Sequence, residues 1–256
     1  LLLFRKAITG QWKWVFLAAI VLGHSTLAGF PQLTLYLYFF LLVFFVFELF
    51  TTHKPGEILR RPVLIATSKI ATAIALSVAV AMIQLLPTIE FADLTFRAQI
   101  TYQKATEGQF SWEQLITFLY PKFFGTAGAG GYNYHGPGTY WYFWETCMYV
   151  GILPATLSIL SFTLFRKNKY ILFFAGFGIF AVLFALGNNF VLHKLFFDFV
   201  PRFSTFRNPA RMGIFLTFGA ALLSAFSLQH ILYSVRTTHE ARRYRNIIWG
   251  VVGLTV

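Results

Sequence analysis

Long apolar runs with almost no charge constrain this chain more than any other feature of its sequence. Residues 33–50, 62–86 and 212–235 form the clearest of these runs. Each is close to the roughly 20 residues that an α-helix needs to cross a hydrocarbon core about 30 Å thick. Two further runs occupy residues 146–165 and 170–186. The sequence therefore predicts an all-α fold, a polytopic transmembrane helical bundle.

Shorter apolar stretches extend the pattern toward both ends of the chain. One stretch runs from Trp14 to about Gly23, Leu1–Phe4 has the character of the tail of an earlier span, and another run begins at Ile247. We therefore expect about seven spans or part-spans. The sequence has the character of a fragment truncated at both ends, so that residues 1–256 form part of one transmembrane domain.

The composition excludes two classes of protein. Hydrophobic residues make up 57% of the chain and charged residues only 12%, which is unlike a soluble globular domain. The net charge of +12 would suit nucleic acid, but the basic residues form short clusters between the apolar runs and not one stripe. We therefore expect membrane lipids as the surroundings and no nucleic acid partner.

The distribution of Lys and Arg predicts how the chain is oriented. Basic residues collect on the cytoplasmic side of membrane proteins. Here most of them fall in alternate loops, and the acidic residues fall mainly in the other loops. The long segments at about 88–145 and 187–211 are therefore predicted to be external. The basic clusters on the opposite, cytoplasmic side lie at residues 5–13, 54–61, 166–169 and 236–245.

A polar stretch interrupts the apolar pattern between Gly23 and Gln32. It brings His24, two hydroxyls and the Gln32 amide to a point near the external membrane face. Non-helical backbone at that depth is tolerated where it lines a wet cavity, so a ligand site that includes His24 and Gln32 is one interpretation. A polar hairpin turn at the membrane interface is the other.

The first external segment is rich in aromatic residues with polar tips. Candidate substrate-binding residues in it are His135, Tyr140, Trp141 and Glu145. Aromatic faces could stack on a sugar while His135 and Glu145 contact its hydroxyls. The aromatic residues could equally form the belt that Tyr and Trp make at membrane interfaces.

Three arginines precede the last long apolar run. Arg202, Arg207 and Arg211 would lie at its external mouth, where their forked guanidinium groups match phosphate oxygens. If a helix begins at Pro209, its N-terminus would favour an anion, and Arg207 and Arg211 could share one face. Contact with lipid headgroups is the alternative role.

Other chemical motifs are weak or missing from the sequence. Cys147 is the only cysteine, so an intrachain disulfide is excluded and a small buried apolar role is expected. His193 and Asp198 could meet in the second external segment, but no metal-binding spacing such as HExxH occurs.

The order of several motifs resembles YfhO-like bacterial membrane proteins. The resemblance covers most of the chain. It is carried by Gly-His-x-x-x-x-Gly-x-Pro-Gln at 23–32, Tyr-Pro-Lys-Phe-Phe-Gly at 120–125, Tyr-Trp-x-x-Trp-Glu at 140–145, Tyr-Val-Gly-Ile-Leu-Pro at 149–154 and Pro-x-Phe-x-x-Phe-Arg-x-Pro-x-Arg at 201–211.

The resemblance implies a GT-C-like fold and a glycosyltransferase activity. Members of that superfamily move a sugar from a polyprenyl-phosphate donor to an acceptor on the external membrane face. The implied acceptor is teichoic acid or another cell-envelope glycan, and the implied location is the bacterial cytoplasmic (inner) membrane. The catalytic acid of such enzymes lies in the first external loop, which is expected upstream of this fragment, and a divalent metal is one option.

Two rival functions fit the same features. A transporter or flippase of a lipid-linked or envelope precursor also uses broken helices and polar groups near the membrane face. Few polar residues inside the runs and no visible inverted repeat weigh against it. A noncatalytic scaffold for envelope assembly is the third alternative.

Overall fold

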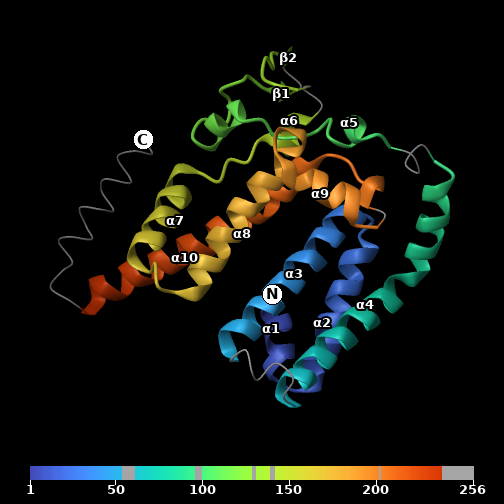
Figure 1. Ribbon diagram of the computed structural model, residues 1–256. Coiled ribbons are helices and arrows are strands. Elements are labelled where there is room, and N and C mark those ends of the chain that lie inside the picture. The colour runs from blue at the N-terminus through green and yellow to red at the C-terminus, as the bar shows by residue number, and fades with distance from the viewer. Residues whose placement is uncertain (54–60, 96–99, 129–130, 139–141, 202, 238–256) are drawn as a thin grey trace. The chain divides into compact units, whose positions relative to one another are not determined.

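The chain folds into helices that divide into two compact units, residues 1–99 and 100–256 (Figure 1). The computed structural model describes residues 1–53, 61–95, 100–128, 131–138, 142–201 and 203–237. Among these residues, three helical segments, Pro31–Thr52, Arg61–Ala92 and Pro209–Tyr233, are long and apolar enough to cross a membrane. The prediction of a helical membrane protein is therefore confirmed in this general form.

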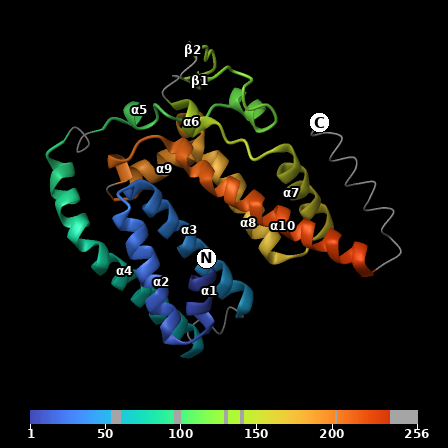
Figure 2. The same ribbon diagram turned by 180° about the vertical axis from the view of Figure 1, so that it is seen from behind.

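The first unit contains helices α1 (Leu2–Thr9), α2 (Trp12–Leu27), α3 (Pro31–Thr52) and α4 (Arg61–Asp93). Helices α2 and α4 lie side by side in both ribbon views (Figures 1 and 2). A Cβ at Gly23 would lie 2.9 Å from Val80 Cγ1, so the missing side chain lets the two helices approach closely.

The predicted break from Gly23 onward is wrong, because α2 stays helical as far as Leu27. Hydroxyl and ring groups in this stretch bond back to their own helix: Thr26 Oγ1 donates to the Leu22 carbonyl at 3.0 Å. The chain turns only at Ala28–Phe30, where Gly29 has a φ of 81°. Gly23 is therefore a packing residue and does not interrupt the helix.

Ionisable groups inside the first unit are paired. Lys69 of α4 is buried, and its Nζ donates to the Gly10 carbonyl at the end of α1, at 2.6 Å. Glu48 of α3 is also buried and lies 3.3 Å from Arg5 Nε. These contacts compensate the cost of placing charges in an apolar bundle, so neither group requires a transport role.

The apolar run at 62–86 stops just before Pro87, which predicts the end of a helix there, but α4 continues through Pro87 to Asp93. Proline removes one backbone donor and crowds the preceding turn. Thr88 Oγ1 donates to the Gln84 carbonyl at 2.7 Å, which supplies a side-chain bond at the disturbed turn. The predicted external segment at about 88–145 therefore begins within the last turns of α4.

The second unit contains four longer helices and several short elements. Helices α7, α8 and α10 pack together in both views (Figures 1 and 2). The short strands β1 and β2 pair with each other, Ala127 with Tyr132 and Gly128 with Gly131. In chain order the elements are α5 (Tyr102–Ala105), η3 (Glu113–Phe118), β1 (Ala127–Gly128), β2 (Gly131–Tyr132), α6 (Phe143–Thr146), α7 (Ile152–Leu164), α8 (Lys169–Ala185), η5 (Gly187–Asn189), α9 (Val191–Phe199), η6 (Phe203–Thr205), η7 (Pro209–Gly213) and α10 (Ile214–Thr237).

The predicted run at 146–165 is helical only from Ile152 to Leu164, after Gly151 with a φ of 91°. Thirteen helical residues span about 20 Å, which is less than the hydrocarbon core. Helix α8 has 17 residues, and the run that begins at Ile247 lies outside the described residues. The number of spans therefore stays a prediction, as does the single transmembrane domain.

The core of the second unit surrounds the C-terminal end of α8. Phe110, Met148, Leu186 and Ala210 are buried together with Ala185. The Phe110 N–H donates to the Ala185 carbonyl at 2.8 Å, which ties the segment before η3 to the last turn of α8. This core positions the segments that carry the candidate site.

Candidate functional site

The segment before α10 is held by an unusual residue, Asn208. Its φ is 67°, in the left-handed region, and its side chain is almost fully buried. Its backbone N–H donates to the Ala105 carbonyl at 2.8 Å. A methyl group at Gly108 would collide with the Asn208 side chain, so only glycine fits there. The stretch from Ala105 to Gly108 therefore packs directly against Asn208, in the segment that leads through η7 into α10.

Arg211 and Glu145 form an ion pair beside this contact. Arg211 lies in η7 and Glu145 in α6, and Arg211 Nε and Nη2 both donate to Glu145 Oε1, at 2.9 and 2.6 Å. The two side chains are 22% and 29% exposed. Glu145 Oε2 is buried and has no hydrogen-bond partner among the described residues. The two residues were predicted for different ligands, and the structure brings them together.

Arg207 lies outside the helical turn that carries Arg211. The left-handed Asn208 separates it from η7, so the expectation that Arg207 and Arg211 share one helix face is wrong. Arg207 is half-buried and forms no ion pair with any described residue. Arg202, the third predicted phosphate ligand, lies outside the described residues.

Three polar residues near the pair were not singled out from the sequence. Glu107 receives a hydrogen bond from Lys104 Nζ at 2.7 Å and another from the Tyr142 hydroxyl at 3.5 Å. Tyr142 is in the turn before Glu145, and Glu107 precedes the Gly108 that packs on Asn208. The i,i+3 charge pair of Lys104 and Glu107 was the available sequence signal.

Of the predicted sugar-contacting residues in the aromatic segment, the structure describes His135 and Glu145. His135 is exposed, and its Nδ1 lies 3.1 Å from the Asn133 carbonyl. Its ring meets Phe124 edge to face at 6.3 Å. Tyr140 and Trp141 lie outside the described residues. Of this predicted group, only Glu145 is therefore described next to a predicted phosphate ligand.

His24 and Gln32 belong to the first unit. His24 is exposed within α2, and its Nδ1 lies 2.8 Å from the Ile20 carbonyl. Gln32 is buried, and its Nε2 donates to the Tyr36 hydroxyl at 2.9 Å. Both residues occupy helices, so the predicted non-helical backbone is confined to Ala28–Phe30.

His193 is a buried residue whose sequence context only weakly indicated a functional role, together with Asp198. It lies among Tyr102, Phe184 and Phe203, with ring centroids 5.1–5.7 Å away. Its Nδ1 has no hydrogen-bond partner among the described residues, and burial lowers its pKa to about 4. Asp198 does not meet it and instead accepts from Lys194 Nζ at 2.7 Å. The ring is therefore neutral at pH 7.

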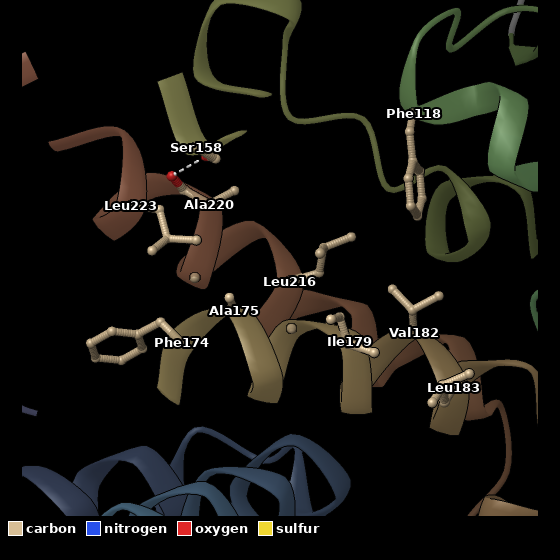
Figure 3. Close-up of a pocket in the computed structure, with 12 residues that line it drawn as sticks. Phe118, Ser158, Phe174, Ala175, Ile179, Val182, Leu183, Leu216, Ala220 and Leu223 are labelled. Carbon is tan, nitrogen blue, oxygen red and sulfur yellow. Dashed lines mark hydrogen bonds between the residues drawn. The ribbon is translucent and has the colours of Figure 1, made fainter. Parts of the chain in front are cut away.

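An apolar groove runs along α8 and α10 (Figure 3). Its volume is about 290 Å³, and Gly178 and Gly219 open it by lacking side chains. The only hydroxyl in its lining, Ser158, donates to the Ala220 carbonyl at 2.9 Å. A satisfied hydroxyl and otherwise apolar walls suit a hydrocarbon chain.

Neither a metal site nor a comparison with known proteins adds to the assignment of a function. Within the described ranges, no three His, Cys, Asp or Glu side chains are grouped closely enough to hold a metal ion. Comparison of the chain with protein-family models, curated proteins and solved structures found no match.

Proposed function

We propose that this chain is part of a GT-C-like membrane glycosyltransferase. The enzyme would move a sugar from a polyprenyl-phosphate donor to teichoic acid or another envelope glycan, on the external face of the bacterial cytoplasmic membrane. One observation carries the proposal. Arg207 is a half-buried cation without an ion-pair partner among the described residues, and it stands at the head of a candidate membrane span.

The charge arrangement favours Arg207 over Arg211 as the main phosphate ligand. Glu145 already balances the charge of Arg211 through two hydrogen bonds to one oxygen. Removing a guanidinium group from water without an anion is costly, so a half-buried Arg207 is stabilised by a bound phosphate. Arg211 and Glu145 then hold the segment that presents Arg207.

The chemistry requires one bond to form as another breaks. The acceptor oxygen bonds to the anomeric carbon of the sugar, and the bond from that carbon to the donor phosphate breaks. The phosphate leaves with the electron pair, and the guanidinium group of Arg207 stabilises its charge. The acceptor proton passes to a general base, the role that the family resemblance implies for its catalytic Asp or Glu.

The groove supports a lipid-linked donor. Most of its walls belong to α8 and α10, and α10 follows directly from η7, the turn that carries Arg211. An isoprenoid chain in the groove would leave its phosphate outside the apolar region. A donor with a hydrocarbon tail therefore fits this unit better than a water-soluble sugar nucleotide.

A transfer assay tests the proposal. Membranes that contain the full-length protein receive a polyprenyl-phosphate donor with a labelled sugar, and control membranes lack the protein. Label should appear in an envelope polymer only when the protein is present. Donor that crosses the bilayer unchanged would instead identify a flippase, and donor that neither reacts nor moves would leave the scaffold alternative.

A further inference from the structure

The stretch Trp112–Phe123 reverses the burial pattern of a water-soluble segment. Its uncharged polar residues Gln114 and Thr117 are only 3% and 5% exposed, whereas the charged Glu113 and Lys122 are exposed. Its apolar residues point outward instead, with Trp112 49% and Leu119 64% exposed. A surface that buries polar groups and exposes large apolar ones is unfavourable against water. The pattern is the one expected where the outer medium is apolar.

The buried polar residues are hydrogen-bonded within the fold, so the reversal is part of the fold. Gln114 Oε1 accepts from the Ser111 N–H at 2.9 Å, and Gln114 Nε2 donates to the Tyr134 hydroxyl at 3.1 Å. Thr117 Oγ1 donates to the Gln114 carbonyl at 2.6 Å. These bonds fix which side of η3 faces inward, and therefore which side chains face outward.

The same stretch is anchored to the apolar helices. Phe118 stacks on Phe110 with ring centroids 5.6 Å apart, and Phe110 is bonded to the last turn of α8. Phe118 also lines the groove on α8 and α10, at the end where Val182 and Leu183 lie (Figure 3). The exposed apolar side chains therefore continue the surface of helices that have the character of membrane spans.

We propose that Trp112–Phe123 lies in the membrane interface and inserts its exposed apolar side chains among the lipid acyl chains. Ile116 and Leu119 enter the hydrocarbon boundary, while the polar edges of Trp112 and Tyr120 stay at the headgroups, as is typical of aromatic residues at interfaces. Lipid is the expected occupant because the surface is continuous with α8 and α10 and because its rim is aromatic. The proposal does not depend on the transferase activity.

Spin labelling tests the proposal in the whole chain. Cys147 is first replaced by Ala, and single cysteines are placed at Ile116, Leu119 and, as a control, the exposed polar Gln103. The labelled proteins are reconstituted in nanodiscs of phosphatidylglycerol and phosphatidylethanolamine. Accessibility is then measured to oxygen, which concentrates in lipid, and to a water-soluble nickel chelate.

Labels at Ile116 and Leu119 should have a higher ratio of oxygen to nickel accessibility than the label at Gln103. A ratio equal to that at Gln103 would place the surface in water and overturn the proposal. Low accessibility to both reagents would also overturn it, since that result indicates cover by protein, either another partner or a second copy of the chain. Size-exclusion chromatography of each variant shows that the labelled proteins remain folded.

Discussion

Arg211 directs both Nε and Nη2 to a single oxygen of Glu145, Oε1, across 66 residues of sequence. This bond joins α6 to the turn that leads into α10. It also gives Arg211 a fixed anionic partner, which leaves Arg207 as the stronger candidate for an external phosphate. The pair is therefore expected to matter first for the stability of the second unit.

Glu145→Gln should destabilise the protein, because it removes the carboxylate charge opposite a largely buried guanidinium group. A hydrogen bond to a charged group contributes about 1.5–3 kcal/mol, so the apparent unfolding temperature in detergent should fall by several degrees. Glu107→Gln is the matched control, since its partner Lys104 is half exposed and such surface pairs contribute little. Equal unfolding temperatures for the two variants would contradict the structural role of Glu145.

Gly108→Ala should destabilise the segment that leads into α10, because the added methyl group collides with the buried Asn208 side chain. Overpacking of this kind costs about 1–3 kcal/mol. Gly176→Ala provides the control: it lies in α8 with nothing within 4 Å of the added carbon, and alanine favours a helix there. The unfolding temperatures of both variants measure the difference. If Gly176→Ala lost stability and Gly108→Ala did not, the close packing of Gly108 against Asn208 would be contradicted.

Because His193 is buried, we expect the protein to lose stability in mild acid. Its pKa is about 4 when folded and about 6.5 when unfolded, so between these values the unfolded state binds a proton that the folded state does not. As pH falls from 6.5 to 4, this one group lowers the free energy of unfolding by up to about 3 kcal/mol.

The variant His193→Phe keeps an aromatic ring and removes the titrating group. Unfolding temperatures at pH 7 and pH 4.5 should differ less for this variant than for the unsubstituted chain. The same difference in both proteins would show that His193 is not responsible for the acid sensitivity.

The orientation of the chain is tested by cysteine labelling in intact cells. In a Cys147→Ala background, cysteines at Asn133 and Ser204 should react with a membrane-impermeant maleimide, because both segments are predicted to be external. A cysteine at Asn168, in a predicted cytoplasmic turn, should react only after permeabilisation. Reaction at Asn168 in intact cells would reverse the predicted topology.

The long helices were predictable from the sequence because hydropathy alone marks them. Residues 33–50 and 212–235 were expected as spans, and helices Pro31–Thr52 and Ile214–Thr237 occupy those places. The errors came from residues whose local preference was outweighed by packing. Gly23 indicated a break but provides a helix contact with Val80, and Pro87 indicated an end but was accommodated within α4.

The candidate site was only partly predictable. Arg211 and Glu145 were each singled out by residue type, but no sequence pattern joins two residues so far apart. Spacing by four suggested that Arg207 and Arg211 share a face, and the left-handed Asn208 prevents it. Since a buried asparagine with positive φ is fixed by its tertiary contacts to Ala105 and Gly108, the sequence alone could not reveal it.

The central claim is that Arg207 binds the donor phosphate. Lysine would keep the charge that a lipid-headgroup anchor needs, but it lacks the forked geometry of a guanidinium group. Loss of one charge-assisted contact of about 1.5–3 kcal/mol predicts a fall in transfer of roughly tenfold or more.

The decisive measurement is therefore the rate of sugar transfer by Arg207→Lys in the full-length protein, normalised to folded protein. Arg166→Lys, an exposed arginine in the turn before α8, serves as the matched control. The proposal predicts at least a roughly tenfold loss for Arg207→Lys and near-normal transfer for Arg166→Lys. Near-normal transfer by both variants would contradict phosphate recognition by Arg207 and leave it as an anchor at the lipid surface.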